Sequence, residues 1–450
     1  MIRLSRSELL STFFPTWIWQ GREWSQWRIP RYDPYYWINA HAHPVISTYY
    51  PPNILSATIF HKASINNKWR GLISCVILHI LLSFIGWLCL LSSFSNSLIS
   101  LFGAITLTLA AYNWKQQPCF QYTVAWFPWM LYGIATHNTL IAGISLGLTI
   151  LAGYYPIGIQ TCAIAFLASI HWHTNPLWIP IGVVIGLPQL IPFIKYLPKT
   201  IRANAHDEIG NVPWWHFASL ISPRSYRYNV NGVGYWEMSY YVGIIPLLTV
   251  WYTTSLAVWL LMGSICLMLG AYWKHLPRIP ARWSYTFQFS LIWCAVNGLA
   301  KLNLSNSVMY VLIGLQTFDL IWHNKDLLVN HPYAELYQKP SWAFNTRLTR
   351  YLEGCKNRIS GLPYPLFTGH INGLHTLGYS GGMQLKLMSK WRNDTNPNGS
   401  GDHDYFKNSQ GDEKLSEYRV EYAFTTAPCN WEPTQLKFLY RNPRVASISG

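Results

Sequence analysis

Apolar runs of membrane-spanning length follow one another through the middle of this chain, from residue 71 to residue 322. Several reach about 17–22 residues, enough for a helix to cross a hydrocarbon core of about 30 Å. The alternative, a buried helical core of a large soluble protein, would need amphipathic helices around it, and few are visible. We therefore predict a mostly α protein, a polytopic transmembrane helical bundle. The candidate spans are residues 71–92, 97–112, 121–136, 139–155, 157–171, 177–197, 239–256, 257–272, 284–300 and 306–322.

Two long polar stretches, residues 10–60 and 198–238, are crowded with Trp, Tyr, His and Arg. Six candidate spans separate them, and an even number of crossings returns a chain to the face it left. We therefore expect both stretches to form aromatic-rich loops on one face, outside the cytoplasmic (inner) membrane. The short loops that would lie inside hold almost no Lys or Arg, so the positive-inside rule says little about orientation.

Beyond residue 323 the chain becomes polar and rich in Gly, Asn and Asp. Residues 418–424 alternate polar and apolar side chains, which is typical of a strand. The sequence thus predicts three parts. They are an N-terminal segment with the first loop (1–70), a transmembrane helical domain with the large loop 198–238 (71–323), and a small α/β or β-rich extracytoplasmic domain (324–450).

Composition agrees with a membrane protein, because only 11% of the residues are charged, against about 25% in soluble domains. The net charge is +15, but no basic run or recognition module is visible. We expect Lys and Arg to meet membrane lipid phosphates, and we expect no nucleic-acid partner. The eight cysteines show no metal-ligand spacing, so no metal site is assigned. No cofactor is assigned with certainty, and a divalent metal is left open.

Short motifs occur in order along nearly the whole chain. They include Gly21, Ile29-Pro30-Arg31-Tyr32-Asp33-Pro34-Tyr35, Tyr50-Pro51-Pro52-Asn53-Ile54-Leu55, Leu151-Ala152-Gly153-Tyr154-Tyr155-Pro156, Tyr241-Val242-Gly243-Ile244-Ile245-Pro246-Leu247-Leu248, Pro277-Arg278-Ile279-Pro280-Ala281-Arg282-Trp283 and Tyr440-Arg441-Asn442-Pro443-Arg444-Val445. In this order they resemble the YfhO-like family of bacterial multi-spanning membrane proteins, which look like GT-C glycosyltransferases. Family members begin with a membrane helix and continue beyond the last motif, so the resemblance implies a copy shortened at both ends.

The resemblance implies transfer of a sugar from a polyprenyl-phosphate donor to a glycan or polymer acceptor outside the membrane. The leaving phosphate then needs Arg or Lys beside it. The acceptor hydroxyl loses a proton, which calls for a carboxylate within hydrogen-bond reach. Sugar rings present apolar faces on which Trp and Tyr can pack.

Candidate residues follow from these requirements, and each has a plainer alternative. The candidate catalytic carboxylates are Asp33, Glu8 and Glu237, which would otherwise be a turn former, a solvated residue near the N-terminus and an interface residue. The phosphate candidates are Lys199, Arg202 and Arg282, which would otherwise anchor the chain by snorkelling. The substrate-binding candidates are Trp37, His41, His43, Trp214, Trp215 and Tyr241, and for Trp214 and Trp215 the alternative is an aromatic belt at the membrane boundary.

Three functions compete at this point. A lipid-linked sugar transferase explains both the aromatic loops and the outer domain. A transporter or flippase of a lipid-linked substrate would need charged or helix-breaking residues inside several spans. The one clear break is Gly153-Tyr154-Tyr155-Pro156, and we expect no buried acid in the spans. A non-catalytic membrane scaffold subunit derived from this fold is the third reading, with protein partners unknown.

Overall fold

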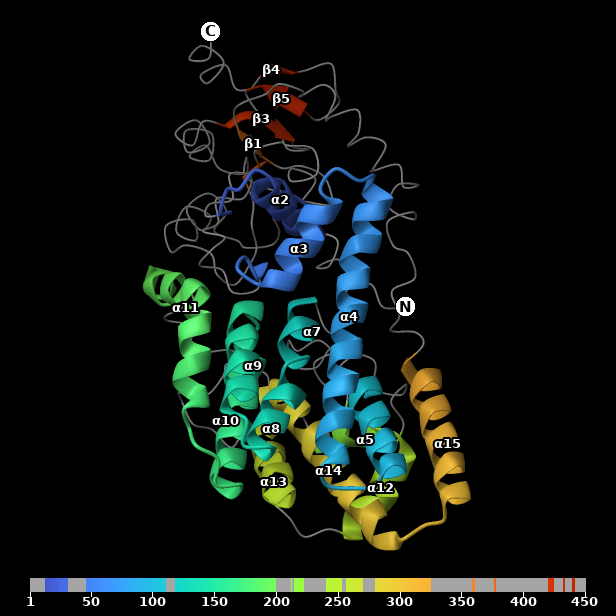
Figure 1. The fold of residues 1–450 in the computed structure, drawn as a ribbon. Helices are drawn as coiled ribbons and strands as arrows, with labels where there is room; N and C mark the ends of the chain where they lie inside the picture. Colours follow the sequence, from blue (N-terminus) through green and yellow to red (C-terminus); the bar gives the residue numbers. More distant parts are fainter. Residues whose placement is uncertain are drawn as a thin grey trace. The chain divides into compact units, whose positions relative to one another are not determined.

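Helices account for most of the described chain, as the sequence predicts. The computed structural model describes residues 13–30, 46–110, 118–199, 212, 214–221, 240–252, 256–269 and 280–324, together with five short strands between residues 358 and 441. The helices are α2 (Phe14–Ser25), α3 (Pro51–Phe60), α4 (Ile65–Ser92), α5 (Ser97–Leu109), α7 (Pro118–Val124), α8 (Phe127–Ala135), α9 (Thr139–Ala152), α10 (Tyr155–His171), α11 (Trp178–Tyr196), α12 (Ile244–Thr249), α13 (Leu256–Met268), α14 (Ser284–Leu302) and α15 (Asn306–Asn324) (Figure 1). Short 3-10 helices are η4 (Leu197–Lys199), η6 (Trp214–Leu220), η8 (Val250–Tyr252) and η9 (Pro280–Trp283).

Two helices of the described chain are long and apolar enough to cross a membrane. They are Asn67–Ser92, which is most of α4, and Trp178–Tyr196, which is α11. Both coincide with predicted spans, which supports membrane association at a coarse level. Four shorter apolar helices coincide largely with other predicted runs: Ser97–Leu109, Thr139–Ala152, Tyr155–His171 and Ala257–Met268.

Two predicted runs are interrupted. Residues 121–136 divide between α7 and α8, and a proline occupies the first turn of α8, where its missing N–H is tolerated. The run 239–256 does not begin as a helix, because residues 240–243 are irregular and α12 starts only at Ile244. Gly243 has a φ of 90° there, a conformation that side chains with a Cβ rarely adopt.

The chain divides into two compact units. The first holds α5 to α10, most of α4 and α11, and everything described from η6 to α15. The second holds α2, α3, the start of α4, the end of α11 and the strands.

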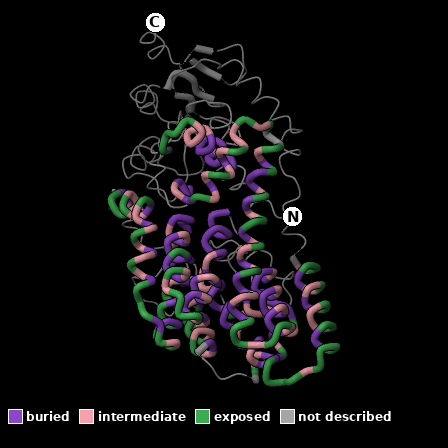
Figure 2. The backbone as a smooth tube through the Cα atoms, in the orientation of Figure 1, coloured by how far each residue is buried: buried purple, intermediate pink, exposed green. Residues whose placement is uncertain are grey.

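The first unit packs around α14, which is buried along nearly its whole length. Trp87 of α4 lies edge-on to Phe127 and stacks on Phe289, with ring centroids 5.5 and 5.6 Å apart. On α15, by contrast, the buried positions Met309, Gln316 and Leu320 recur along one side (Figure 2). A stripe with this spacing faces the neighbouring helices and leaves the rest of α15 exposed.

Helices α9 and α11 pack at close range because glycines alternate with branched side chains. A Cβ on Gly147 would lie 2.5 Å from the Ile185 side chain, and one on Gly182 would lie 2.5 Å from Leu146. Gly143 and Gly186 face Ile181 and Ile150 in the same way. Small residues that let two backbones approach are the usual basis of helix association in membranes.

The second unit corrects part of the prediction for residues 10–60. The structure folds α2 and α3 within that stretch, which the sequence predicts as a loop, and it buries Trp17 and Trp19. Asn53 donates to Gln20 Oε1 at 2.9 Å, and Gln20 donates to the Ile46 carbonyl at 2.9 Å, so α2 and α3 share a buried polar link. Prolines in the first turn of each helix set the backbone for helix entry.

Five short strands form one sheet in the order β2-β1-β3-β5-β4. Their bounds are β1 (Arg358–Ser360), β2 (Thr376–Leu377), β3 (Val420–Phe424), β4 (Glu432–Pro433) and β5 (Leu439–Arg441). Strand β1 pairs in parallel with β2 and β3, whereas β5 pairs antiparallel with β3 and β4. The strand predicted over 418–424 is confirmed as β3.

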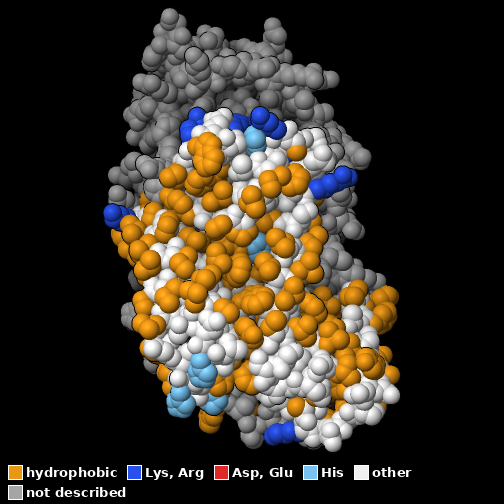
Figure 3. All heavy atoms as spheres, in the orientation of Figure 1, with side chains coloured by type: hydrophobic (Ala, Val, Ile, Leu, Met, Phe, Trp, Pro, Cys, Tyr) orange, Lys and Arg blue, Asp and Glu red, His pale blue; other side chains and the backbone are white. Residues whose placement is uncertain are grey.

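Apolar side chains cover much of the described surface in the view of Figure 3, and no acidic side chain is visible on it. Exposed large residues include Leu140, Ile159, Phe166, Val184 and Phe318, each more than 40% accessible. Contiguous apolar surface of this extent marks a membrane or protein interface rather than a water-facing exterior.

Candidate functional site

The corner between α9 and α10 holds a buried tyrosine beside an arginine. Gly153 ends α9 with a φ of 84°, the left-handed conformation typical of a helix C-terminus. The next residue, Tyr154, is buried, and its backbone N–H donates to Thr123 Oγ1 at 3.2 Å. Phe120 lies edge-on to the Tyr154 ring, with centroids 5.8 Å apart. The predicted turn at this point is therefore confirmed, and it fixes the orientation of an aromatic ring.

Arg282 lies against that ring. It belongs to η9, directly before α14, and its guanidinium carbon is 5.8 Å from the Tyr154 ring centroid. A cation over an aromatic face at this distance contributes about 0.5–2 kcal/mol, more when it is shielded from water. The half-buried Arg282 is thus held in place by the corner, and a guanidinium so placed can bind a phosphate through two parallel hydrogen bonds.

An aromatic cluster packs on the start of α14. Phe217 of η6 stacks on Tyr240 with centroids 5.4 Å apart, and both rings contact Phe287 of α14. Trp214, at the start of η6, is 76% exposed. The cluster therefore anchors η6 on α14 and leaves one large indole on the surface.

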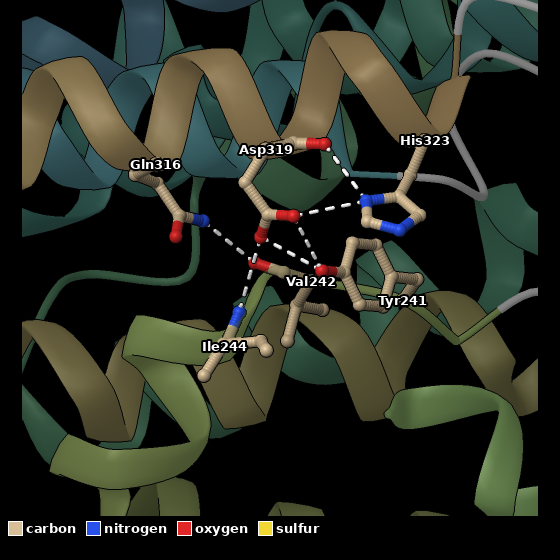
Figure 4. Close-up of polar contacts among 6 residues, drawn as sticks. All are labelled: Tyr241, Val242, Ile244, Gln316, Asp319 and His323. Carbon is tan, nitrogen blue, oxygen red and sulfur yellow. Dashed lines mark hydrogen bonds and ion pairs between the residues drawn. The ribbon is translucent and has the colours of Figure 1, made fainter. Parts of the chain in front are cut away.

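The residue after Tyr240 contacts a carboxylate on α15. The Tyr241 hydroxyl lies 2.7 Å from both carboxylate oxygens of Asp319, to which it donates, and the backbone N–H of Ile244 donates to Asp319 Oδ2 at 3.3 Å. Figure 4 shows Asp319 and His323 projecting from α15 toward Tyr241. His323 Nδ1 lies 2.9 Å from Asp319 Oδ1, and the rings of His323 and Tyr241 are 4.6 Å apart at their centroids.

Two glutamines hold the same backbone segment, residues 240–243. Gln316 of α15 donates to the Val242 carbonyl at 2.7 Å, and Gln288 of α14 donates to the Tyr241 carbonyl at 3.3 Å. An irregular backbone has no helical partner for its polar groups, and inside a protein each unpaired group is costly. The glutamines satisfy these carbonyls, so the segment can lie between α14 and α15.

Each of these groups is linked to the first turns of α14. Arg282 precedes the helix, Phe287 contacts the aromatic cluster, and Gln288 holds residues 240–243. We call this assembly the α14 site and define it as Tyr154, Arg282, η6, residues 240–243, Asp319 and His323.

The α14 site offers a fixed cation, a carboxylate with a histidine, and aromatic rings. Such groups can bind an anionic head group and pack on an apolar ring face. The carboxylate oxygens are engaged by Tyr241, Ile244 and His323, which suits Asp319 to positioning its neighbours. No three His, Cys, Asp or Glu side chains within the described ranges are arranged to hold a metal ion.

Several predicted residues are part of the α14 site as defined. Arg282 contacts Tyr154, Tyr241 contacts Asp319, and Trp214 and Trp215 belong to η6, where Trp215 lies next to the buried His216. Lys199 ends η4, and its side chain lies outside the description. The other predicted residues lie outside the described ranges: Glu8, Asp33, Trp37, His41, His43, Arg202 and Glu237.

Sequence reasoning missed Asp319 and His323. One acid does lie in a predicted span: Asp319 falls within the run 306–322, and its side chain is partly buried, at 23% exposed. The signal was present in the sequence: an Asp and a His four residues apart share one helix face, and a carboxylate inside an apolar run is a candidate functional residue by default.

In comparisons with known proteins, no model of a protein family matches the chain, and no curated protein matches it.

Proposed function

We propose that the protein is a multi-pass glycosyltransferase of the cytoplasmic (inner) membrane with a GT-C-like helical bundle and a small extracytoplasmic C-terminal domain. It transfers a sugar from a polyprenyl-phosphate donor to a glycan or polymer acceptor outside the membrane. The observation that carries the proposal is the position of Arg282, held over the Tyr154 ring directly before α14. The family resemblance of the ordered motifs supports the same reaction.

In this proposal Arg282 neutralises the donor phosphate as the bond between the phosphate oxygen and the sugar breaks. The departing phosphate keeps the electron pair, and the acceptor oxygen forms the new bond to the sugar. A carboxylate takes the acceptor proton, and we assign this step to Asp33, Glu8 or Glu237. Asp319 acts instead as a positioning residue, because Tyr241, Ile244 and His323 already engage its oxygens.

The test uses the full chain in proteoliposomes with a panel of polyprenyl-phosphate sugars. Release of polyprenyl phosphate is measured, since it is common to every donor sugar. We expect Arg282→Gln to lower the release rate by about 100-fold or more, a loss typical of removing a transition-state charge partner. Arg282→Lys should restore part of the rate. The control Lys301→Gln removes an exposed cation from the last turn of α14 and should leave the rate unchanged.

The carboxylates are tested in the same assay with Asp33→Asn, Glu8→Gln and Glu237→Gln. We expect one of the three to lose most of the activity. If all three release polyprenyl phosphate at the wild-type rate, the assignment of the proton acceptor is wrong. If the wild type turns over no donor in the panel, the transferase proposal itself fails.

A transporter or flippase of a lipid-linked substrate is the second candidate, because Asp319 lies in the predicted run 306–322 and its partner His323 follows directly after it. Ionisable groups inside membrane helices often mark transport pathways. Under this reading, Asp319→Asn abolishes movement of a fluorescent polyprenyl-phosphate lipid between vesicle leaflets, and no polyprenyl phosphate is released. A scaffold subunit would show neither activity.

A further inference from the structure

Helix α2 ends in a turn that presents an exposed tryptophan. The backbone N–H of Arg28 donates to the Glu23 carbonyl, and that of Trp27 donates to the Trp24 carbonyl, each at 3.0 Å. These two bonds form a Schellman motif, in which Trp27 occupies the left-handed position with a φ of 57°. Its side chain is 92% exposed, the highest value among the large hydrophobic residues described. The turn therefore holds the indole outside the packed part of the second unit.

Tryptophan is an unusual residue for this position. Glycine is the common choice because it has no Cβ, and a bulky side chain makes the left-handed conformation costly. The other non-glycine residues with a positive φ in the described ranges are one Ser, one Asn and two His. Asn and His are among the types that tolerate it best. Backbone strain of this kind is often kept at functional sites, so a strained residue whose side chain packs on nothing is a candidate for binding.

An ion pair bridges the same turn. Arg28 Nε and Nη2 donate to Glu23 Oε2 and Oε1, both at 3.0 Å. This two-bond pair links the residues on either side of Trp27 and balances the charge of the guanidinium. Gln26, between the helix and Trp27, is exposed, and its amide can both donate and accept hydrogen bonds. The neighbours of the indole in the chain are thus polar but carry no net charge.

These properties fit a neutral sugar better than a lipid head group or a protein. A sugar ring has an apolar face that packs on an aromatic ring, and its hydroxyls donate and accept hydrogen bonds. Anionic head groups bind basic clusters, whereas Arg28 is already bonded to Glu23. A protein partner is expected to cover a contiguous apolar patch, whereas Trp27 stands between the polar residues Gln26 and Arg28.

We propose that the turn of residues 23–28 binds a sugar ring of a neutral glycan, with the ring packed on the indole of Trp27. The ion pair between Arg28 and Glu23 holds the turn, and the indole supplies the contact. Under the proposed function this glycan is the acceptor. Only that last assignment rests on the transfer reaction, because sugar binding to the turn needs no lipid-linked donor.

The test measures binding of the full chain in detergent to an array of neutral oligosaccharides, followed by calorimetry with the ligand that binds most tightly. We expect Trp27→Gly to weaken binding by about tenfold or more, since truncating a central aromatic anchor is among the most costly changes in a binding site. Trp27→Tyr keeps an aromatic ring and should retain most of the affinity. The control Trp259→Ala removes an indole that is 77% exposed on α13 and should bind as the wild type does.

Stability separates the loss of the indole from a loss of the fold. Trp27→Gly places the preferred residue at the left-handed position. Its unfolding temperature should therefore equal or exceed that of the wild type. Weaker sugar binding without a loss of stability is the result expected of a residue that serves a ligand. A fall in unfolding temperature would show that Trp27 stabilises the turn, and the comparison of Trp27→Tyr with the wild type then decides whether the ring binds sugar.

Four results would overturn the proposal. The first three are no binding of the wild type to any oligosaccharide on the array, wild-type affinity in Trp27→Gly, and the same loss of affinity in Trp259→Ala. The fourth tests a lipid in place of a sugar. In lipid nanodiscs, Trp27→Cys should react with a water-soluble maleimide beyond the labelling of the wild type, and protection of the new thiol would place the turn in lipid. Failure of the transferase assay alone leaves these outcomes unchanged, because no donor is present in them.

Discussion

Two helix interfaces of the first unit are held together by opposite means. Helices α9 and α11 meet through glycines and branched side chains, whereas α14 and α15 meet around residues 240–243 through hydrogen bonds from Gln288, Gln316 and Tyr241. In a membrane, close packing is enough to associate helices, and buried polar groups add cost unless they are paired. We therefore expect the buried polar groups between α14 and α15 to be present for function, since close apolar packing alone could hold two helices together.

We expect the largest loss of stability from a substitution at Gly243, in the segment 240–243 between α14 and α15. Its φ of 90° is strained for any residue with a Cβ, and a Cβ there would lie 2.4 Å from the Gln316 amide. Relief would displace Gln316 and leave the Val242 carbonyl without its donor. We expect Gly243→Ala to lower the free energy of unfolding by about 3–5 kcal/mol, measured by denaturation in detergent.

Gly314 supplies the control on the same helix as Gln316. Nothing lies within 4 Å of a Cβ placed on it. Gly314→Ala should change stability by less than about 1 kcal/mol, in the favourable direction, because Ala is the better helix former. Equal losses in the two variants would show that residues 240–243 are not specially constrained.

Asp319→Ala is expected to lower the free energy of unfolding by about 2–3 kcal/mol, because it leaves the Tyr241 hydroxyl and the Ile244 N–H without their acceptor. The comparison variant is Glu23→Ala, whose carboxylate is 20% exposed, much like that of Asp319, but whose partner Arg28 is 58% exposed. Arg28 can bond to water once Glu23 is removed, so this variant should lose only about 0–1 kcal/mol. If the two variants lose the same stability, the hydrogen bonds from Tyr241 and Ile244 to Asp319 do not contribute specially to the fold.

At the apolar interface, Gly182→Ala brings a Cβ within 2.5 Å of Leu146 Cβ and Cγ. Overpacking of this kind costs about 1–3 kcal/mol. Gly263→Ala on α13 meets nothing within 4 Å and serves as the reference. If Gly182→Ala is as stable as Gly263→Ala, then α9 and α11 are not closely packed.

Tyr241→Phe should have the smallest effect, a loss of about 1 kcal/mol, since single hydrogen bonds in membrane proteins rarely exceed that by much. The double variant Tyr241→Phe/Asp319→Ala measures the coupling. We expect it to lose less than the two single losses added together, because both changes remove the same bond. Strict additivity would show that the phenol and the carboxylate do not interact.

The sequence predicts those elements that local patterns control. The long apolar runs of α4 and α11, the corner at Gly153 and the alternating strand β3 all depend on neighbours within a few residues. The ordered motifs also mark Tyr241 and Arg282 as candidate site residues, although the sequence does not show which residues they contact. These residues belong to the α14 site in the structure.

Other features depend on partners far away in the chain. Residues 14–25 are dense in Trp and polar groups and give little sign of a helix, yet α2 forms because α3 packs on it and Asn53 bonds to Gln20. Asp319 acquires its partners from a segment more than 70 residues earlier. No pattern within α15 reveals that Tyr241 lies opposite.

The glycines of α9 and α11 also limit how the molecule can move. Gly143, Gly147, Gly182 and Gly186 each contact one branched side chain of the opposite helix. If one helix slid along the other, these four side chains would all clash with backbone atoms. We therefore expect α9 and α11 to move together as one rigid pair in any conformational change of the first unit.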